Sequence, residues 1–161
     1  MLVSWNTTNQ CNMFCDHCYR EAGARLEDEL DTDQAKKLIR EIKKAGFHIM
    51  IFSGEEPLMR PDIYELGAYA TQQGLRPVLG TNGSLITPQV ATALKEVGFM
   101  AAGVSLDILD PNKNNAFRKL DRAFELTLEG IENLKTAGLP FQVHTTVMDW
   151  NVNELEGLTD F

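Results

Sequence analysis

Three cysteines packed into a short segment carry the clearest chemistry in this sequence. Cys11, Cys15 and Cys18 are the only cysteines among 161 residues, and all fall within eight positions. An odd number excludes a complete set of intrachain disulfides. Thiolates are soft ligands suited to iron–sulfur clusters and to zinc. Three of them can hold three irons of a cubane cluster and leave the fourth iron open to another ligand.

Two other interpretations of the cysteines stay open from spacing alone. A zinc site would take His17 as its fourth ligand and give a Cys3His set. His17 is adjacent to Cys18, however, and lacks the spacing usual for separate ligand pairs. The third interpretation is a reduced and chemically inert trio. The softness and number of the thiols favour the cluster.

Composition narrows the possible partners. The formal net charge of −8 at pH 7 argues against binding to a phosphate backbone, so we expect no nucleic-acid partner. The first residues show no basic start followed by a long apolar run, as a signal peptide would. No stretch approaches the ~20 apolar residues of a spanning helix. We therefore expect a cytoplasmic protein with no membrane partner.

The elements that must position the cysteines follow a regular alternation. Helical spacing of apolar residues, each time ended by glycine, alternates with short β-rich runs. Asp31 or Thr32 caps the first helix, with Gln34 placed to complete a capping box with Asp31. The expected helices are 31–46, 61–74, 87–98 and a longer one through 124–138, and the expected strands are 2–8, 47–53, 75–82, 99–107 and 140–148.

This order predicts an α/β fold with parallel strands joined by right-handed helical crossovers. We expect one domain over residues 1–161, with residues 23–30 as a surface loop. Residues 107–120 are expected to form a second long loop, or a loop with a short turn. The last strand would be left as a sheet edge, which proteins usually cover. We therefore expect a fragment, or a sheet that something else completes.

Unusual polar or glycine-rich segments follow every expected strand. They are residues 11–18, 53–57, 80–83, 105–107 and 145–151. In parallel α/β folds the carboxyl ends of the strands gather at one rim, where ligands bind. The sequence thus predicts a single site there. His48 reads as structural from its strand pattern, whereas the direction of His144 on the last strand is left open.

These residues carry a resemblance to a known family. The spacing of Cys11, Cys15 and Cys18, with His17 before the last, resembles the C-x3-C-x-Φ-C hallmark of the radical S-adenosylmethionine (SAM) enzymes. Gly54-Glu55-Glu56-Pro57 is similar to the GGEP segment of that family. The likeness continues through Thr81-Asn82-Gly83, Ser105-Leu106-Asp107 and Ala116-Phe117-Arg118.

The resemblance implies a partial TIM-like (β/α)6 barrel, of which about five βα units are present, truncated at the carboxyl end. It implies a [4Fe-4S] cluster on the three cysteines, with SAM on the open iron. It places the SAM amino group on residues 54–57, the ribose near Ser105, and the adenine near the backbone beside His17. Asp107 and Arg118 would support the ribose or the carboxylate. The full expected SAM-binding set is His17, Gly54, Glu55, Glu56, Pro57, Asn82, Ser105, Asp107 and Arg118, and no residue is expected to be catalytic in itself.

One position departs from the family pattern. Glu55 stands where the motif normally has its second glycine. If that position needs a positive φ, glutamate would be strained there. The extra carboxylate would otherwise point away and change little.

The family chemistry is reductive cleavage of SAM, followed by removal of a hydrogen atom from a substrate. An electron donor such as flavodoxin or ferredoxin is implied. The residues around the cysteines look most like members that modify tetrapyrrole side chains in heme biosynthesis, and a peptide-modifying maturase is the alternative. Such enzymes usually carry a C-terminal cysteine-rich domain. No cysteine follows Cys18, so we expect no such domain within these 161 residues. Within the enzyme interpretation, this chain would then be an inactive fragment. The alternative from another class is a non-catalytic zinc-binding or structural α/β module.

Overall fold

The computed structural model describes residues 1–19 and 22–160, and their strands form one five-stranded sheet. The strands run parallel in the order β1-β2-β3-β4-β5, so each strand pairs with its neighbour in sequence. This is the parallel α/β arrangement that the sequence predicts. The strands are β1 (Leu2–Asn6), β2 (Ile49–Ser53), β3 (Arg76–Thr81), β4 (Ala101–Ser105) and β5 (Phe141–His144).

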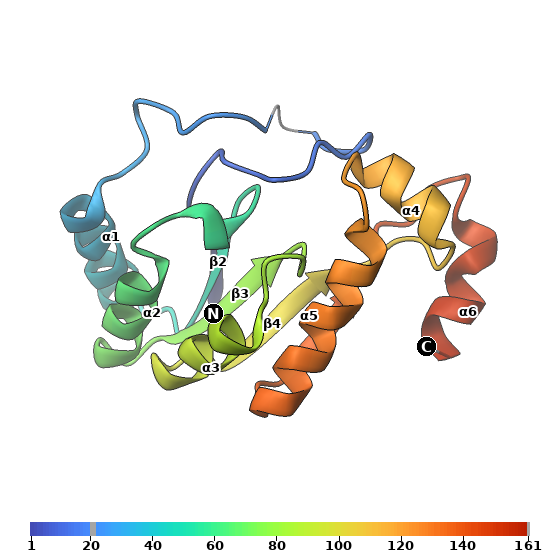
Figure 1. Cartoon of the computed structure of the whole chain (residues 1–161). Helices are drawn as coiled ribbons and strands as arrows, with labels where there is room; N and C mark the ends of the chain where they lie inside the picture. Colours follow the sequence, from blue (N-terminus) through green and yellow to red (C-terminus); the bar gives the residue numbers. More distant parts are fainter. Residues whose placement is uncertain (20–21, 161) are drawn as a thin grey trace.

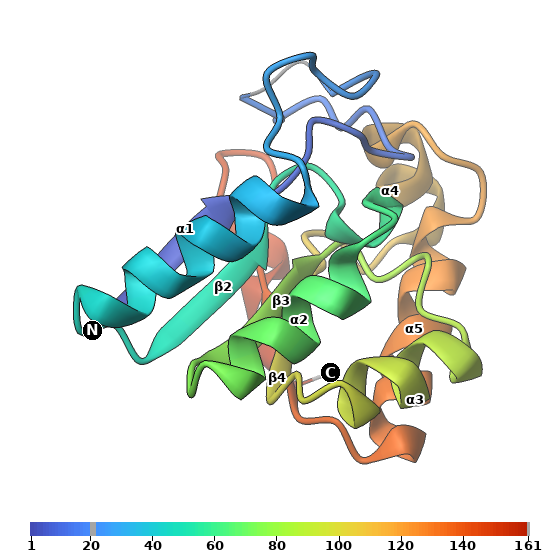
Figure 2. The same ribbon diagram turned by 90° about the vertical axis from the view of Figure 1, so that its left-hand side faces the viewer.

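Helices connect successive strands and cover one face of the sheet. Helices α1, α2, α3 and α5 lie on that face, as two perpendicular views show (Figures 1 and 2). All four were expected from glycine-terminated helical periodicity. The helices are α1 (Thr32–Lys44), α2 (Ile63–Gln72), α3 (Pro88–Glu96), α4 (Pro111–Arg118), α5 (Ala123–Ala137) and α6 (Leu155–Asp160), with short 3-10 turns η1 (Pro57–Met59) and η2 (Val152–Glu154).

Helix α1 begins at the capping box that its sequence encodes. The Asp31 carboxylate accepts a hydrogen bond from the Gln34 backbone N–H at 2.8 Å, and the Gln34 side chain accepts one from the Asp31 N–H at 3.0 Å. Two backbone donors that a helix start leaves unpaired are thereby satisfied. Ile39 and Ile42 turn inward from this helix and are buried.

The hydrophobic core lies between the sheet and its helices. Met50 and Phe52 alternate along β2 and are fully buried on the helix side. Phe52 contacts Trp5 and Phe99 edge to face, with ring centroids 5.9 and 5.6 Å apart. Burial of each such large side chain stabilises the fold by about 1.5–3 kcal/mol. Trp5 also lies under the Arg60 guanidinium, so it packs in this layer.

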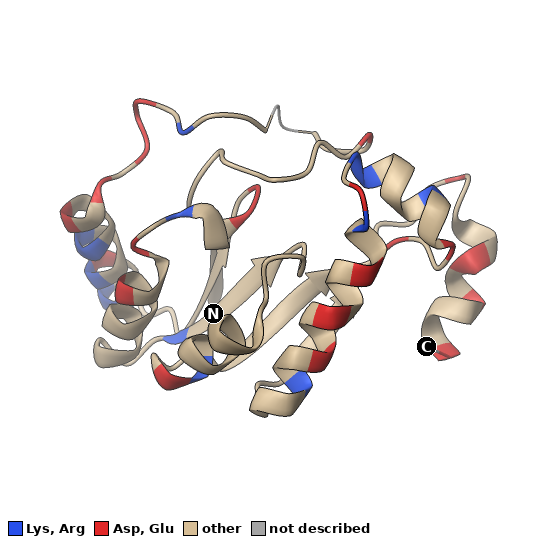
Figure 3. Ribbon diagram, in the orientation of Figure 1, with Lys and Arg blue, Asp and Glu red and all other residues tan. Residues whose placement is uncertain are grey.

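The opposite face of the sheet carries small and polar side chains. Ser53, Gly80, Gly103, Ser105 and His144 lie along a pocket at the carboxyl ends of β2 to β5. The strands hold almost none of the charge of the protein, which sits on helices and loops (Figure 3). No helix in the described ranges is both long and apolar enough to cross a bilayer.

The expected loop at 107–120 contains a two-turn helix, which corrects the prediction. Helix α4 begins at Asp110, whose carboxylate accepts a hydrogen bond from the Lys113 N–H at 2.9 Å. Its inward-facing residues include Asn114 and Arg118, which are buried. These polar side chains give no apolar periodicity, so the pattern that reveals other helices is missing here. The helix ends at Lys119, which has a left-handed φ of 53°.

Candidate active site

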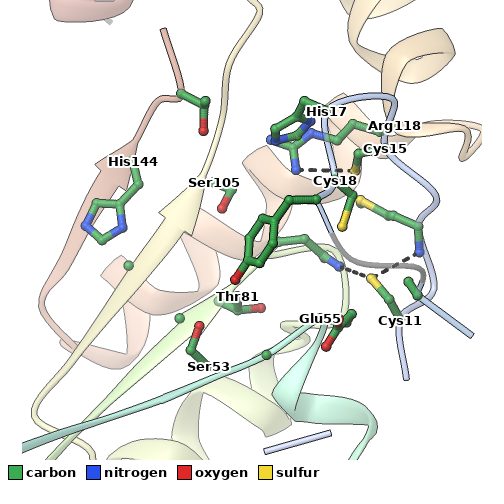
Figure 4. A pocket seen from close by; sticks show the side chains of 18 residues that line it. Cys11, Cys15, His17, Cys18, Ser53, Glu55, Thr81, Ser105, Arg118 and His144 are labelled. Atoms are coloured by element: carbon green, nitrogen blue, oxygen red, sulfur yellow. Dashed lines mark hydrogen bonds between the residues drawn. The ribbon is translucent and has the colours of Figure 1, made fainter. Parts of the chain in front are cut away.

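A pocket of about 360 Å³ opens where the β2 to β5 strands end. Its walls come from the loop that follows β1 (residues 7–19, the cysteine loop), the loops after β2 and β3, and the ends of β4 and β5. Figure 4 shows the three cysteines on one side and His144 on the other. The pocket is lined by Cys11, Met13, Cys15, His17, Cys18, Tyr19, Ala22, Ser53, Gly54, Glu55, Gly80, Thr81, Asn82, Gly103, Ser105, Arg118, His144 and Thr146.

Helix α4 holds the cysteine loop in place. The Phe14 N–H donates to the Arg118 carbonyl at 3.2 Å, and the Asp16 N–H donates to the Phe117 carbonyl at 3.1 Å. Carbonyls at the end of a helix lack intrahelical partners, so these two bonds satisfy them. Lys119 adds an ion pair with Asp16. The helix that the sequence did not reveal is therefore the support of the cysteine loop.

Hydrogen-bond donors are directed at two of the cysteine sulfurs. The Met13 N–H and the Asn82 side-chain amide lie 3.4 and 3.9 Å from the Cys11 Sγ. Arg118 Nη1 lies 3.7 Å from the Cys15 Sγ. Donors and a cation near sulfur stabilise the thiolate form, which is the form that binds metal.

Burial opposes that stabilisation as long as no metal is bound. Burial, together with the negative charges of Glu56 and Cys15, raises the pKa of the Cys11 thiol to about 11. It also raises the pKa of Cys15, against the lowering effect of the Arg118 charge. Several thiolates in one half-buried place need a large positive charge nearby. A bound metal provides that charge, and coordinating thiols are therefore deprotonated.

The donor set fits an iron–sulfur cluster. Three soft thiols line one pocket, and N–H groups and a guanidinium reach their sulfurs. No three His, Cys, Asp or Glu side chains among residues 1–19 and 22–160 converge on the position of a single ion. A cubane instead places each thiolate on its own iron.

The contacts of His17 do not direct its ring toward a metal-binding role. Its ring stacks on Phe117 with centroids 4.7 Å apart, and its Nε2 lies 3.9 Å from the Asp107 carboxylate. Burial lowers the pKa of His17, although the Asp107 charge opposes the shift. The ring packing supports the three-cysteine set over the Cys3His set.

Glu55 does not have the positive φ that would strain a glutamate. The positive φ belongs to Gly54, at +118°, where a Cβ would lie 2.8 Å from the Thr8 carbonyl oxygen. Among the described non-glycine residues, only Lys119 and Arg122 have a positive φ, so Glu55 has an ordinary backbone. Its side chain lines the pocket (Figure 4). The first glycine of the segment is thus required by geometry, and the second position accepts a side chain.

Glu56 lies behind the pocket wall and joins two loops. Its fully buried carboxylate accepts hydrogen bonds from the Thr81 hydroxyl at 2.9 Å, the Asn82 N–H at 2.8 Å and the Leu58 N–H at 3.1 Å. Burial raises the pKa of Glu56 to about 7, although these donors oppose the shift. The side chain therefore fixes the segment after β2 against the end of β3, and Pro57, also buried, begins η1 beside it.

Asn82 connects the end of β3 to the cysteine loop. Its amide group donates to the Asn12 side-chain oxygen at 2.9 Å, besides facing the Cys11 sulfur. Its own side-chain oxygen accepts from the Ser84 N–H at 2.9 Å. The generic turn of residues 81–83 thus also presents a donor to the site.

Asp107 and Arg118 form a buried ion pair beside the cysteines. Arg118 Nη2 donates to Asp107 Oδ2 at 2.5 Å, and Asp107 Oδ1 accepts from the Thr146 N–H at 2.7 Å. Arg118 lines the pocket, whereas Asp107 lies behind it. The pair fixes the direction of the guanidinium toward Cys15.

The structure brings most of the expected SAM-binding residues together. Those that line the pocket are His17, Gly54, Glu55, Asn82, Ser105 and Arg118, whereas Glu56, Pro57 and Asp107 do not line it. Four further polar residues line the pocket although the expected SAM-binding set does not include them: Ser53, Thr81, His144 and Thr146. Ser53, Thr81 and Thr146 fall in the strand-end segments that the sequence predicts to form the site, whereas the sequence leaves the direction of His144 open.

With this geometry in place, comparison with known proteins decides the family. Residues 5–161 match the model of the radical SAM superfamily. The chain belongs to the radical SAM superfamily. The match covers the cysteine loop, all four neighbouring strand ends and the helices between them, so the resemblance predicted from the motifs is confirmed.

Two curated relatives from Methanosarcina barkeri are similar over nearly the whole chain. The AdoMet-dependent heme synthase is 43% identical over 155 residues, which are 96% of this chain and 44% of the relative. The Fe-coproporphyrin III synthase is 40% identical over 160 residues, which are 99% of this chain and 40% of the relative. This radical SAM chain therefore spans less than half the length of both proteins.

A solved structure confirms the partial-barrel fold. The structure of anSMEcpe with bound AdoMet superposes with a TM-score of 0.81 and 21% identity, over 99% of this chain and 47% of that one. At this identity the likeness speaks for the fold alone. The predicted radical SAM partial barrel of α/β type is thus confirmed.

Proposed function

We propose that this chain supplies the catalytic core of a cytoplasmic radical SAM enzyme that modifies carboxylate-bearing side chains of an iron tetrapyrrole in heme biosynthesis. The observation that carries the proposal is the single pocket lined by three thiols and by the segment after β2. The names of the two Methanosarcina relatives point to tetrapyrroles as the substrate class. They favour this class over a peptide.

Cys11, Cys15 and Cys18 would hold a [4Fe-4S] cluster, and Gly54, Glu55, Asn82, Ser105 and Arg118 would surround the SAM molecule. The bound cofactors supply one-electron reductive cleavage of SAM and the hydrogen-atom abstraction that follows from it. An electron donor such as flavodoxin or ferredoxin would deliver the electron.

The chain's own residues would bind and orient the cluster and SAM and would shield them from water. The Asn82 amide and the Arg118 guanidinium hold charge-stabilising donors toward the sulfurs at fixed positions. Glu56 fixes the loop that faces the SAM amino group by tying it to β3. The cysteine loop forms one wall of the pocket, and exclusion of water by a bound substrate would strengthen every electrostatic contact inside.

Anaerobic reconstitution with iron and sulfide tests the proposal. We expect a brown protein with about four irons per chain, whose reduced-state EPR spectrum changes when SAM is added. With dithionite, SAM and Fe-coproporphyrin III, we expect 5′-deoxyadenosine and a mass change in the porphyrin. A colourless protein that binds one zinc would overturn the cluster. A brown protein that cleaves SAM but leaves the porphyrin unchanged would overturn the substrate class.

A further inference from the structure

The imidazole of His144 occupies the space above a glycine of the neighbouring strand. His144 pairs with Ser105 in the parallel register, and its carbonyl accepts a hydrogen bond from the Leu106 N–H at 3.0 Å. A Cβ placed on Gly103 would lie 2.4 Å from the ring Cε1 and 2.8 Å from Nδ1. Because real Cβ atoms do not approach so closely, the ring requires glycine at residue 103 to lie where it does.

The ring therefore lies on the pocket face of the sheet, where His144 is exposed, and not on the face that the helices cover. His144 lies across the pocket from Cys11 and Cys15, with Ser105 between them (Figure 4). The wall between these two sides is made of small residues, Gly80 and Gly103 among them. A wall without bulky side chains leaves room for a flat ligand. His144 lies at the far end of this wall from the cysteines.

His144 also differs from His17 and Arg118, the other basic side chains that line the pocket, because no carboxylate of the described residues contacts its ring. Arg118 is paired with Asp107 and faces Cys15, and the Nε2 of His17 faces Asp107. Within the described part of the chain, the His144 ring makes no hydrogen bond and no ion pair. Glu55 places a carboxylate on the same pocket. An anionic substrate group entering the pocket therefore needs a donor to offset that charge, and His144 is placed to provide it.

We propose that His144 binds a carboxylate side chain of the tetrapyrrole and so positions the substrate across the pocket from the cysteines. The inference rests on the proposed function, because a tetrapyrrole carboxylate is the group it receives. The ring N–H donates to a carboxylate oxygen, and no bond is made or broken. The reacting side chain is then held at the cysteine side while another carboxylate is anchored by His144.

Substitution of His144 by phenylalanine tests the contact with little change of shape. His144→Phe keeps a ring above Gly103 and removes both nitrogens, whereas His144→Gln keeps a donor. His48→Phe is the matched control, because His48 is exposed at the opposite end of the sheet, before β2. The reconstituted chain is titrated with Fe-coproporphyrin III and its visible absorption is followed. We expect His144→Phe to weaken binding about tenfold, His144→Gln to recover part of the loss, and His48→Phe to bind as the wild type does.

A double-mutant cycle with Gly103 separates ring position from other effects. Gly103→Ala should weaken porphyrin binding in the wild-type background, because the methyl group displaces the ring. The same change in a His144→Ala background should have no further effect, since no ring remains to be displaced. Equal losses in both backgrounds would overturn the role of the ring. Iron content and SAM affinity should not change in the His144 variants.

The outcomes distinguish this inference from the function it rests on. A wild-type chain that does not bind the porphyrin overturns both. Porphyrin binding that His144→Phe leaves intact overturns the inference alone. The last comparison repeats the titration with metal-free coproporphyrin III. If His144→Phe weakens the binding of both porphyrins equally, the result supports a carboxylate contact. A loss confined to the iron porphyrin would show ligation of the iron by His144 and would overturn the carboxylate role.

Discussion

Arg118 reaches the Cys15 sulfur with one guanidinium nitrogen while the other is bound to a buried carboxylate. The Nη1–Sγ distance is 3.7 Å, and Nη2 donates to Asp107. The planar guanidinium makes both contacts in a fixed geometry, which an ammonium group does not reproduce. Asp107 is itself fixed by the Thr146 N–H. The cation beside Cys15 is therefore held by the segment after β4 and the loop after β5 together.

Arg118→Lys should lower the reduction potential of the bound cluster. Lysine keeps the positive charge but not the fixed guanidinium donor, and loss of a hydrogen bond that favours the reduced state makes reduction harder. We expect a shift of on the order of 50 mV, equivalent to one hydrogen bond of about 1 kcal/mol. Redox titration followed by EPR measures it. Arg40→Lys on the exposed side of α1 is the control, and an unchanged potential in Arg118→Lys would contradict the role given to this contact.

Cys15→Ala should abolish assembly of the cluster while the fold remains. Each thiolate of a three-cysteine set holds a different iron, so the loss of one leaves an incomplete cubane. Iron content after anaerobic reconstitution should fall well below four per chain, with far-ultraviolet circular dichroism unchanged. Normal iron content and an unchanged EPR spectrum would remove Cys15 from the ligand set.

The cysteine motif and the helix caps could be predicted because their chemistry is local. Asp31 and Gln34 complete a capping box within four residues, and the cysteine spacing is itself the signal. Helix α4 could not be predicted in this way. Its buried face uses Asn114 and Arg118, whose role depends on partners that lie far away in the sequence.

The direction of His144 could not be predicted for a related reason. Side chains alternate along a strand, so the face each one takes is set by the register with the neighbouring strand. The pairing of His144 with Ser105 and the open space at Gly103 decide it, and both are tertiary properties. The backbone of Glu55 is a similar case, because only the structure shows that Gly54 takes the positive φ.

Glu55→Gln should weaken SAM binding without destabilising the protein. The carboxylate lines the pocket from an unstrained backbone, in the segment that faces the SAM amino group in this family. An amine N–H that donates to a carboxylate makes a charge-assisted hydrogen bond, and its loss should weaken binding several-fold. Equilibrium dialysis with the reconstituted protein measures the affinity. Glu27→Gln, in an exposed loop, is the matched control. Equal or tighter binding in Glu55→Gln would mean that the side chain points away from the cofactor.

Glu56 should make the metal-free protein less stable as the pH rises from about 4.5 to 7. Burial raises its pKa from 4.5 to about 7, so the folded state binds a proton that the unfolded state releases in this window. The stabilising contribution is fully present below pH 4.5 and is lost as the pH rises through 7. The change amounts to at most about 3 kcal/mol.

Denaturant unfolding at pH 5 and pH 8 checks this with Glu56→Gln, which cannot titrate. The free energy of unfolding of the wild type, relative to that of the variant, should fall between the two pH values. Glu96→Gln, on an exposed carboxylate at the end of α3, should leave the pH dependence of the wild type unchanged. A constant difference between wild type and Glu56→Gln would show that Glu56 keeps an ordinary pKa in the folded protein.

Gly54→Ala should destabilise the fold, and Gly23→Ala should not. Gly54 has a φ of +118° and would place a Cβ 2.8 Å from the Thr8 carbonyl oxygen, whereas a Cβ on Gly23 would meet no atom within 4 Å. Strain of φ and a backbone clash together cost about 2 kcal/mol or more. Thermal unfolding of the metal-free variants measures the difference, which should lower the melting temperature of Gly54→Ala by several degrees. Because Glu55 needs no positive φ, Glu55→Ala should melt close to the wild type. A loss of stability in Glu55→Ala as large as in Gly54→Ala would show that the loop after β2 depends on both positions.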